Sequence, residues 1–175
     1  KAIWPHIILD RAKPGVIAVN DDGKRFVNES DSYHDFCMAQ LKTNQGKAKI
    51  QSYLICDQTA IQKYGLGFVL PGAKKLDYYL KAKYLFSANS LEELAQKVGI
   101  NAQGLVSTVQ RFNQLVELGT DTEFGKGSGV MNRFNGDPEV KPNPCLGKLE
   151  QGPFYALPVI PMDCASSGGL AGDIY

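Results

Sequence analysis

A pair of capped amphipathic helices in the middle of the chain places the strongest constraint on its fold. Ser90, with Glu93 three residues later, forms a capping box in front of an apolar stripe that ends at Gly99. Asn101 is a second N-cap, and the stripe after it ends at Gly119. Each stripe occupies one side of its helix, so both helices are predicted to pack on a core. The stripe residues are Leu91, Leu94, Ala95 and Val98, then Leu105, Val109, Phe112 and Val116.

The first third of the chain carries a hairpin pattern. Residues 15–19 are apolar and indicate a strand, residues 20–23 end in Asp-Gly, and residues 25–27 indicate a returning strand. Asp-Gly between apolar runs is a strong turn signal, because glycine accepts the positive φ that such turns need. The sequence therefore predicts an antiparallel pair of strands here.

The other predicted elements are short and alternate in type. Pro158 cannot donate a hydrogen bond to a neighbouring strand, so the strand that contains it is expected at a sheet edge or to be irregular. The chain has 175 residues, the size of one domain. We predict an α+β fold, with a small mixed sheet and helices around it. The further strands are expected over 52–56, 84–87 and 154–160, and the further helices over 32–41, 58–64 and 76–81.

A stretch rich in glycine and proline covers residues 125–153, where ten of 29 residues are one or the other. Long stretches without regular structure are uncommon in compact domains. Phe134, Leu146 and Leu149 provide apolar anchors, so we expect a long ordered loop packed on the surface.

Charge and cysteine content exclude several classes of function. Nineteen Lys and Arg face eighteen Asp and Glu, so no net field would attract nucleic acid or an anionic membrane. No apolar run approaches the roughly 20 residues of a membrane span. With two histidines and no CxxC pair, no metal site is predicted. Four scattered cysteines favour reduced thiols in a cytosolic protein, and they are Cys37, Cys56, Cys145 and Cys164.

Residue patterns alone do not identify an enzyme. The fingerprints GxGxxG and GxxxxGK[ST] are both missing, and the glycine-rich run 125–129 indicates a cluster of turns. His34 beside Asp35 is either an acid–base pair or an exposed pair on a first helical turn. Tyr33 either packs its ring or acts as a proton acceptor, which a phenol with an ordinary pKa near 10 does at neutral pH only with help from neighbours or a helix N-terminus.

Several motifs together resemble a flavoprotein family. They are residues 13–20, 23–30 and the pair Ser32-Tyr33, followed by residues 152–156 and 166–170 with Asp173. The chain is similar in these motifs to the substrate-capping domain of fumarate reductases, succinate dehydrogenase flavoproteins and 3-ketosteroid dehydrogenases. The resemblance implies a capping domain over residues 1–150 and the start of a return segment over 151–175, with the FAD-binding domain absent from this chain. It also implies that this piece alone is inactive.

The residues after Asn28-Glu29 separate the branches of that family. The resemblance implies that fumarate reductases have an arginine three residues after the glutamate. This chain has Ser32 at that place. Tyr33 resembles the tyrosine that serves as proton acceptor in the ketosteroid dehydrogenases. By that resemblance, Tyr33 would take a proton from the carbon next to a ketone. The resemblance implies FAD as cofactor and a small-molecule ketone, with a steroid as one candidate. It assigns the flavin neighbours to Ser167, Gly168 and Gly169.

Two other functions stay open at this point. The full protein could instead reduce a fumarate-like or urocanate-like acid, which would need convergent arginines. The chain could also be a non-enzymatic binding module whose Gly/Pro-rich loop recognises a partner. The leading hypothesis is an FAD-dependent oxidoreductase that introduces or reduces a C=C bond beside a carbonyl, whose partners are the ketone and its own FAD-binding domain.

Overall fold

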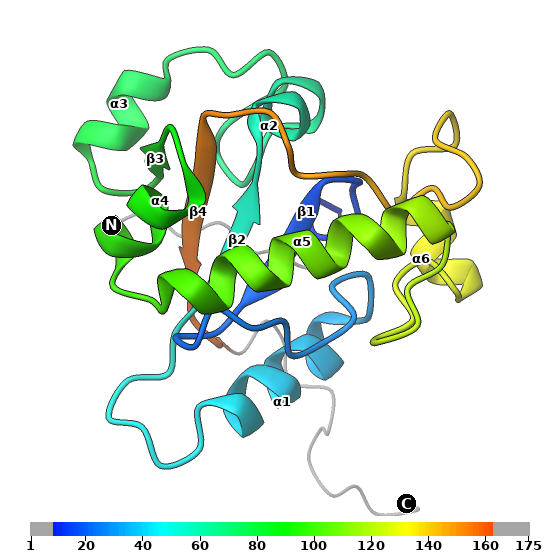
Figure 1. Cartoon of the computed structure of the whole chain (residues 1–175), viewed down its shortest axis with the longest axis horizontal. Coiled ribbons are helices and arrows are strands. Elements are labelled where there is room, and N and C mark those ends of the chain that lie inside the picture. The colour runs from blue at the N-terminus through cyan, green and yellow to red at the C-terminus, as the bar shows by residue number, and fades with distance from the viewer. Residues whose placement is uncertain (1–8, 163–175) are drawn as a thin grey trace, which may run out of the picture.

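The computed structural model describes residues 9–162, and its centre is a four-stranded sheet (Figure 1). The strands follow the order β1-β2-β4-β3, and every pair is antiparallel. The coarse class α+β is therefore confirmed, whereas the expected mixed sheet is wrong for the described strands. The strands are β1 (Val16–Val19), β2 (Ser52–Cys56), β3 (Phe86–Ala88) and β4 (Phe154–Val159).

Six helices in the described part of the chain surround this sheet. Four of them begin at a side-chain cap: for example, the Asp57 side chain accepts a hydrogen bond from the N–H of Ala60, and the Ser90 side chain accepts one from the N–H of Glu93. The middle pair of helices is confirmed by α4 and α5. The helices are α1 (Tyr33–Thr43), α2 (Gln58–Tyr64), α3 (Leu76–Lys81), α4 (Leu91–Val98), α5 (Ala102–Leu118) and α6 (Val130–Asn135).

Both faces of the sheet are buried against helices. Successive residues of β1 alternate between two apolar clusters, with Val16 in one and Ile17 in the other. The first cluster contains Phe36 of α1 and Ile61 of α2. The second contains the stripes of α4 and α5, and Figure 1 shows α5 crossing in front of the sheet. Two covered faces explain why β1 and β2 are buried throughout.

The predicted hairpin does not form. After β1 the chain makes a single bridge between Val19 and Arg25, and residues 25–27 are not a strand. The N–H of Ala18 donates instead to the carboxylate of Glu29, at 3.0 Å. A side chain thus occupies the position that a returning strand would take, and β1 pairs with β2 on its other side.

The strand with Pro158 is central, which corrects the expectation of an edge strand. Pro158 lies opposite Tyr53 of β2. Strand β3 pairs with β4 only as far as Phe86 opposite Ala156, so Pro158 lies beyond the part of β4 that has a neighbour on that side. The predicted strand over 84–87 is shifted to 86–88, because the N–H groups of Tyr84 and Leu85 donate to the carbonyl of Tyr79.

The Gly/Pro-rich stretch is not one uninterrupted loop. It contains α6, which the glycine and proline content had hidden. Leu146 and Leu149 are buried as expected, but Phe134 is 84% exposed and anchors nothing. The stretch also sends polar side chains inward, and these form the site described below.

No helix within residues 9–162 is long and apolar enough to cross a bilayer.

Candidate functional site

Tyr33 is the first residue of α1 and lies at the surface. Ser32 is the N-cap, and its side chain accepts a hydrogen bond from the N–H of Asp35 at 3.1 Å. Tyr33 is 38% exposed, and its hydroxyl makes no hydrogen bond to the described residues. The next residues of the same helix to face inward are Phe36 and Gln40. Tyr33 is thus partly exposed, and the choice between its two interpretations stays a prediction.

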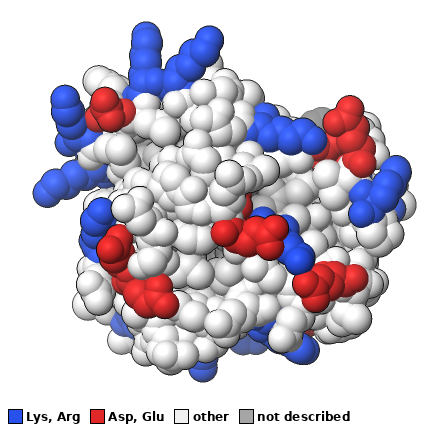
Figure 2. All heavy atoms as spheres, turned by 45° about the horizontal axis from the view of Figure 1, so that its top comes forward, with Lys and Arg blue, Asp and Glu red and all other residues white. Residues whose placement is uncertain are grey.

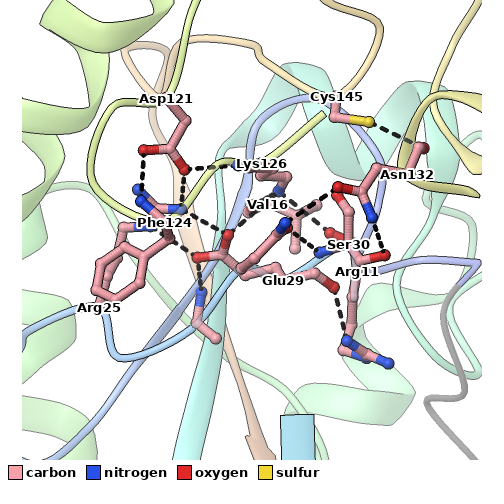
Figure 3. A network of polar contacts seen from close by, with 12 residues as sticks. Arg11, Val16, Arg25, Glu29, Ser30, Asp121, Phe124, Lys126, Asn132 and Cys145 are labelled. Carbon is pink, nitrogen blue, oxygen red and sulfur yellow. Dashed lines mark hydrogen bonds and ion pairs between the residues drawn. The ribbon is translucent and has the colours of Figure 1, made fainter. Parts of the chain in front are cut away.

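The segment in front of Tyr33 is anchored by the buried carboxylate of Glu29 (Figure 3). One oxygen accepts from the N–H of Ala18 and from Nε of Arg25, at 3.0 and 2.8 Å. The other accepts from Nη2 of Arg25 at 2.8 Å and lies 3.8 Å from Nζ of Lys126. Burial alone would raise the pKa of Glu29, but the charges of Arg25 and Lys126 outweigh burial and lower it. Glu29 is therefore a fixed anion.

Arg25 joins Glu29 to a second buried carboxylate. Its Nη2 also donates to Asp121 at 2.8 Å, and its guanidinium lies 4.9 Å from the ring centroids of Phe112 and of Phe124. Burial works against the charge of Arg25, yet the two carboxylates raise its pKa above the ordinary range. Asp121 closes its own turn by accepting from the N–H groups that follow it.

Lys126 completes this ionic cluster, which consists of Arg25, Glu29, Asp121 and Lys126. It stands between Gly125 and Gly127, whose φ angles of 74° and 78° let the chain turn the lysine into the interior. Its Nζ donates to the carbonyls of Arg11 and Val16. Burial lowers its pKa to about 8. With two cations and two anions, the cluster is balanced, as a buried set of charges must be.

Two more side chains hold the backbone between Glu29 and Tyr33. Nη1 of Arg11 donates to the carbonyl of Glu29 at 2.6 Å, and the guanidinium lies 4.3 Å from the ring centroid of Phe36. The amide of Asn132, on α6, reaches the same backbone from the other side, at the carbonyl of Ser30. Tyr33 thus follows a segment that is held by the side chains of Arg11, Arg25, Lys126 and Asn132.

The site residues predicted from the sequence differ in how far the structure describes them. Tyr33 begins α1 and is partly exposed, and its role as proton acceptor stays a prediction. Ser167, Gly168 and Gly169 lie outside the described residues. His34 and Asp35 are both exposed, and Asp35 hydrogen-bonds to Ser32 through its carboxylate. Sequence reasoning missed four residues of the site, namely Arg11, Asp121, Lys126 and Asn132. A lysine between two glycines at 125–127 was the one available signal.

The outer surface differs from this interior. Figure 2 shows side chains of both signs on one face, with the positive ones gathered towards the upper left. A surface hollow lies between the 22–25 turn and the first half of α5, where Arg111 pairs with Glu123 at 2.8 Å. Tyr33 does not line this hollow. Tyr33 lies instead at the start of α1, where it is 38% exposed.

The family described as "FAD binding domain" matches residues 2–174. The chain belongs to this family. Its membership corrects the expectation that the chain is a capping fragment without the FAD-binding domain, because the match runs through residue 150 and covers nearly every residue. The division at residue 150 itself stays a prediction.

Individual relatives are named as dehydrogenases and as fumarate reductases. The 4-oxocyclohex-2-ene-1-carboxylate 5-dehydrogenase of Sinomonas cyclohexanicum is 43% identical over 98% of this chain and 29% of that protein. The cytochrome-type fumarate reductase of Shewanella frigidimarina is 32% identical over 91% of this chain and 23% of its own length. The chain thus spans less than a third of these relatives.

A solved relative shows the same fold. The crystal structure of 3-ketosteroid Δ1-dehydrogenase from Sterolibacterium denitrificans, in complex with 1,4-androstadiene-3,17-dione, has a TM-score of 0.81 and 35% sequence identity to this chain. It matches 87% of this chain and 28% of that one.

Proposed function

We propose that the full protein is an FAD-dependent oxidoreductase that dehydrogenates a C–C bond next to a ketone, with Tyr33 as proton acceptor. The observation that carries the proposal is the partly exposed side chain of Tyr33, which follows a segment whose Glu29 carboxylate is bonded to Ala18 and Arg25. A proton acceptor must reach its carbon acid and must keep a fixed position. The exposure of Tyr33 and the bonded segment before it support the proposal on both points.

The chemistry removes a proton and a hydride from adjacent carbons. A ketone acidifies the C–H bond at its α carbon, and the oxygen of Tyr33 would take that proton. The C–H electron pair at the β carbon leaves as hydride, and an enone remains. The first turn of a helix favours negative charge, so the position of Tyr33 at the start of α1 supports this role.

FAD fits this arrangement in part. The described residues offer the partly exposed side chain of Tyr33, which a planar ring can cover, but the sequence has no phosphate cradle of the GxGxxG kind. When bound, the flavin accepts the hydride. We therefore propose that residues 1–150 form the substrate-facing part, and that residues 151–175 lead to the flavin through Ser167, Gly168 and Gly169.

We propose a ring ketone as the substrate class. Several relatives have an oxocyclohexene or a ketosteroid in their names. Each of these compounds carries a ketone on a six-membered ring. A steroid is one candidate and a single-ring ketone is the other. The phenol of Tyr33 would contact the α C–H in both, because the reacting part of the two molecules is the same.

A fumarate-like substrate fits the described site less well. Two of the arginines, Arg11 and Arg25, are buried and already bonded to protein groups. Arg111 pairs with Glu123, and Arg133 donates to the carbonyls of Gly127 and Pro142. Ser32, which caps α1, occupies the place where the family resemblance gives fumarate reductases an arginine. The described arginines thus do not converge beside Tyr33.

Steady-state turnover of the full protein with a dye as electron acceptor tests the proposal. We expect oxidation of a 3-ketosteroid or a 4-oxocyclohexane carboxylate, and no reduction of fumarate. Tyr33→Phe is expected to lower turnover about 100-fold, the scale for losing a positioned proton acceptor. His34→Ala is the matched control, as the neighbouring exposed residue. Reduction of fumarate alone, or an unchanged Tyr33→Phe enzyme, would reject the proposal.

A further inference from the structure

Helix α6 reverses the usual distribution of side chains. It buries two amides, Asn132 at 5% and Asn135 at 7% exposed. It exposes its apolar residues, with Val130 at 88% and Phe134 at 84%. A helix whose role is to fill a core turns its apolar side inward. The inward side of α6 therefore has another role, and the hydrogen bonds of its two amides show what each one does.

The amide of Asn132 is fully used, and every partner lies in the segment before Tyr33. Its Nδ2 donates to the carbonyl of Ser30 at 2.8 Å and to the carboxylate of Asp31 at 3.3 Å. Its Oδ1 accepts from Nδ2 of Asn28 at 3.0 Å. Buried amides are tolerated only when they are bonded in this way. Figure 3 shows Asn132 pointing from α6 to Ser30.

Asn135 offers a contrast within the same helix. It is as buried as Asn132, but its Nδ2 donates at 2.9 Å to the carbonyl of Met131, one turn back on α6. Within residues 9–162 its side chain makes no hydrogen bond to the 28–31 segment. Asn135 therefore stabilises the helix, whereas Asn132 ties the helix to the segment that carries the phenol.

We propose that Asn132 is a positioning residue for Tyr33. This inference rests on the proposed function, since it assigns a reason for the rigidity that the proton transfer needs. Arg11 holds the carbonyl of Glu29, and Asn132 holds the next carbonyl, that of Ser30. Without Asn132 the Ser30 carbonyl loses this buried donor, and the chain can move to find water. A misplacement of about 1 Å can cost about 100-fold in rate.

Turnover of the full protein with Asn132→Ala tests this inference. We expect kcat to fall about 10- to 100-fold and KM to change less than threefold, because the ketone does not contact Asn132. Asn135→Ala is the matched control and should keep kcat within about twofold. Should Asn132→Ala fail to fold, Asn132→Ser, which retains a donor, carries the same test and should lose about 10-fold.

A double-mutant cycle with Tyr33→Phe separates the two proposals. If Asn132 acts through the phenol, adding Asn132→Ala to Tyr33→Phe should lower kcat by no more than twofold. Equal losses in both backgrounds, or equal losses for Asn132→Ala and Asn135→Ala, would overturn the positioning role and leave the proton acceptor intact. A fully active Tyr33→Phe enzyme would overturn both.

Discussion

The apolar core between α5 and the sheet and the ionic cluster around Glu29 are neighbours that are held together by different kinds of contact. The apolar core joins α4 and α5 to the sheet through many nondirectional contacts. The ionic cluster joins Arg25, Glu29, Asp121 and Lys126 through a few directed bonds. The two meet at Phe112, which belongs to the core and contacts Arg25.

The two regions differ in how strictly they fix the position of a side chain. Apolar packing tolerates small shifts, because a side chain can slide and stay buried. A carboxylate that accepts from both Ala18 and Arg25 cannot shift without losing a bond. Tyr33 comes four residues after Glu29, so the segment before it is held by directed bonds.

The largest expected effect on stability comes from breaking the ionic cluster. Glu29→Gln leaves Arg25 and Lys126 as buried cations with one anion between them. Removing one partner of a buried pair costs about 3–5 kcal/mol. We expect the free energy of unfolding, measured by urea titration, to fall by that amount.

The control for this change is Glu123→Gln, which removes a carboxylate from the partly exposed pair with Arg111. Such surface pairs contribute about 0–1 kcal/mol. If the two variants lose equal stability, the buried cluster has no special weight.

Truncating the apolar core should cost somewhat less. Leu105 is fully buried against the sheet side of α5. Leu105→Ala removes buried methyl groups and leaves a cavity, so we expect a loss of about 3 kcal/mol in thermal or urea unfolding. Leu118→Ala, at a leucine of the same helix that is 69% exposed, should cost less than about 0.5 kcal/mol. Turnover of the folded Leu105→Ala enzyme should change little, unlike that of the Asn132 variant.

Acid should act on the ionic cluster and not on the apolar core. The pKa of Glu29 is lowered below 4.5 and that of Asp121 below 3.8, because Arg25 outweighs burial at both. A lowered pKa means that the unfolded chain binds the proton first, so stability is present above pH 4.5 and falls as the pH drops through these values. Each pKa unit corresponds to about 1.4 kcal/mol.

Urea titrations between pH 7 and pH 3 measure this dependence. Glu29→Gln should show a smaller loss of stability with acid than the unchanged protein, whereas Leu105→Ala should show the same loss. An equal acid dependence in the unchanged protein and in Glu29→Gln would place the sensitive groups elsewhere.

Local patterns predicted the regular elements well. The helix from Gln58 to Tyr64 follows from Asp57 as cap and Gly65 as end, both of which lie within a few residues of it. The stripes on α4 and α5 are likewise local, since they repeat within one helix. These signals need no knowledge of the rest of the chain.

The ionic cluster could not be predicted in the same way. Glu29 and Arg25 are four residues apart, but Asp121 is 96 residues from Arg25 and enters from the end of another helix. The hairpin prediction failed for the same reason, because the sequence gives no sign that the Glu29 side chain takes the N–H of Ala18. Helix α6 was missed because its apolar residues face outward and its buried residues are amides.

The most direct test of the account is a single-turnover measurement on the full protein. Loss of flavin absorbance after rapid mixing with a 3-ketosteroid or a 4-oxocyclohexane carboxylate reports the dehydrogenation step alone. With bound flavin and folding unchanged, Tyr33→Phe is expected to slow this step about 100-fold or more, while His34→Ala leaves it within twofold. An equal rate of flavin reduction in Tyr33→Phe and the unchanged enzyme would contradict the proton-acceptor role.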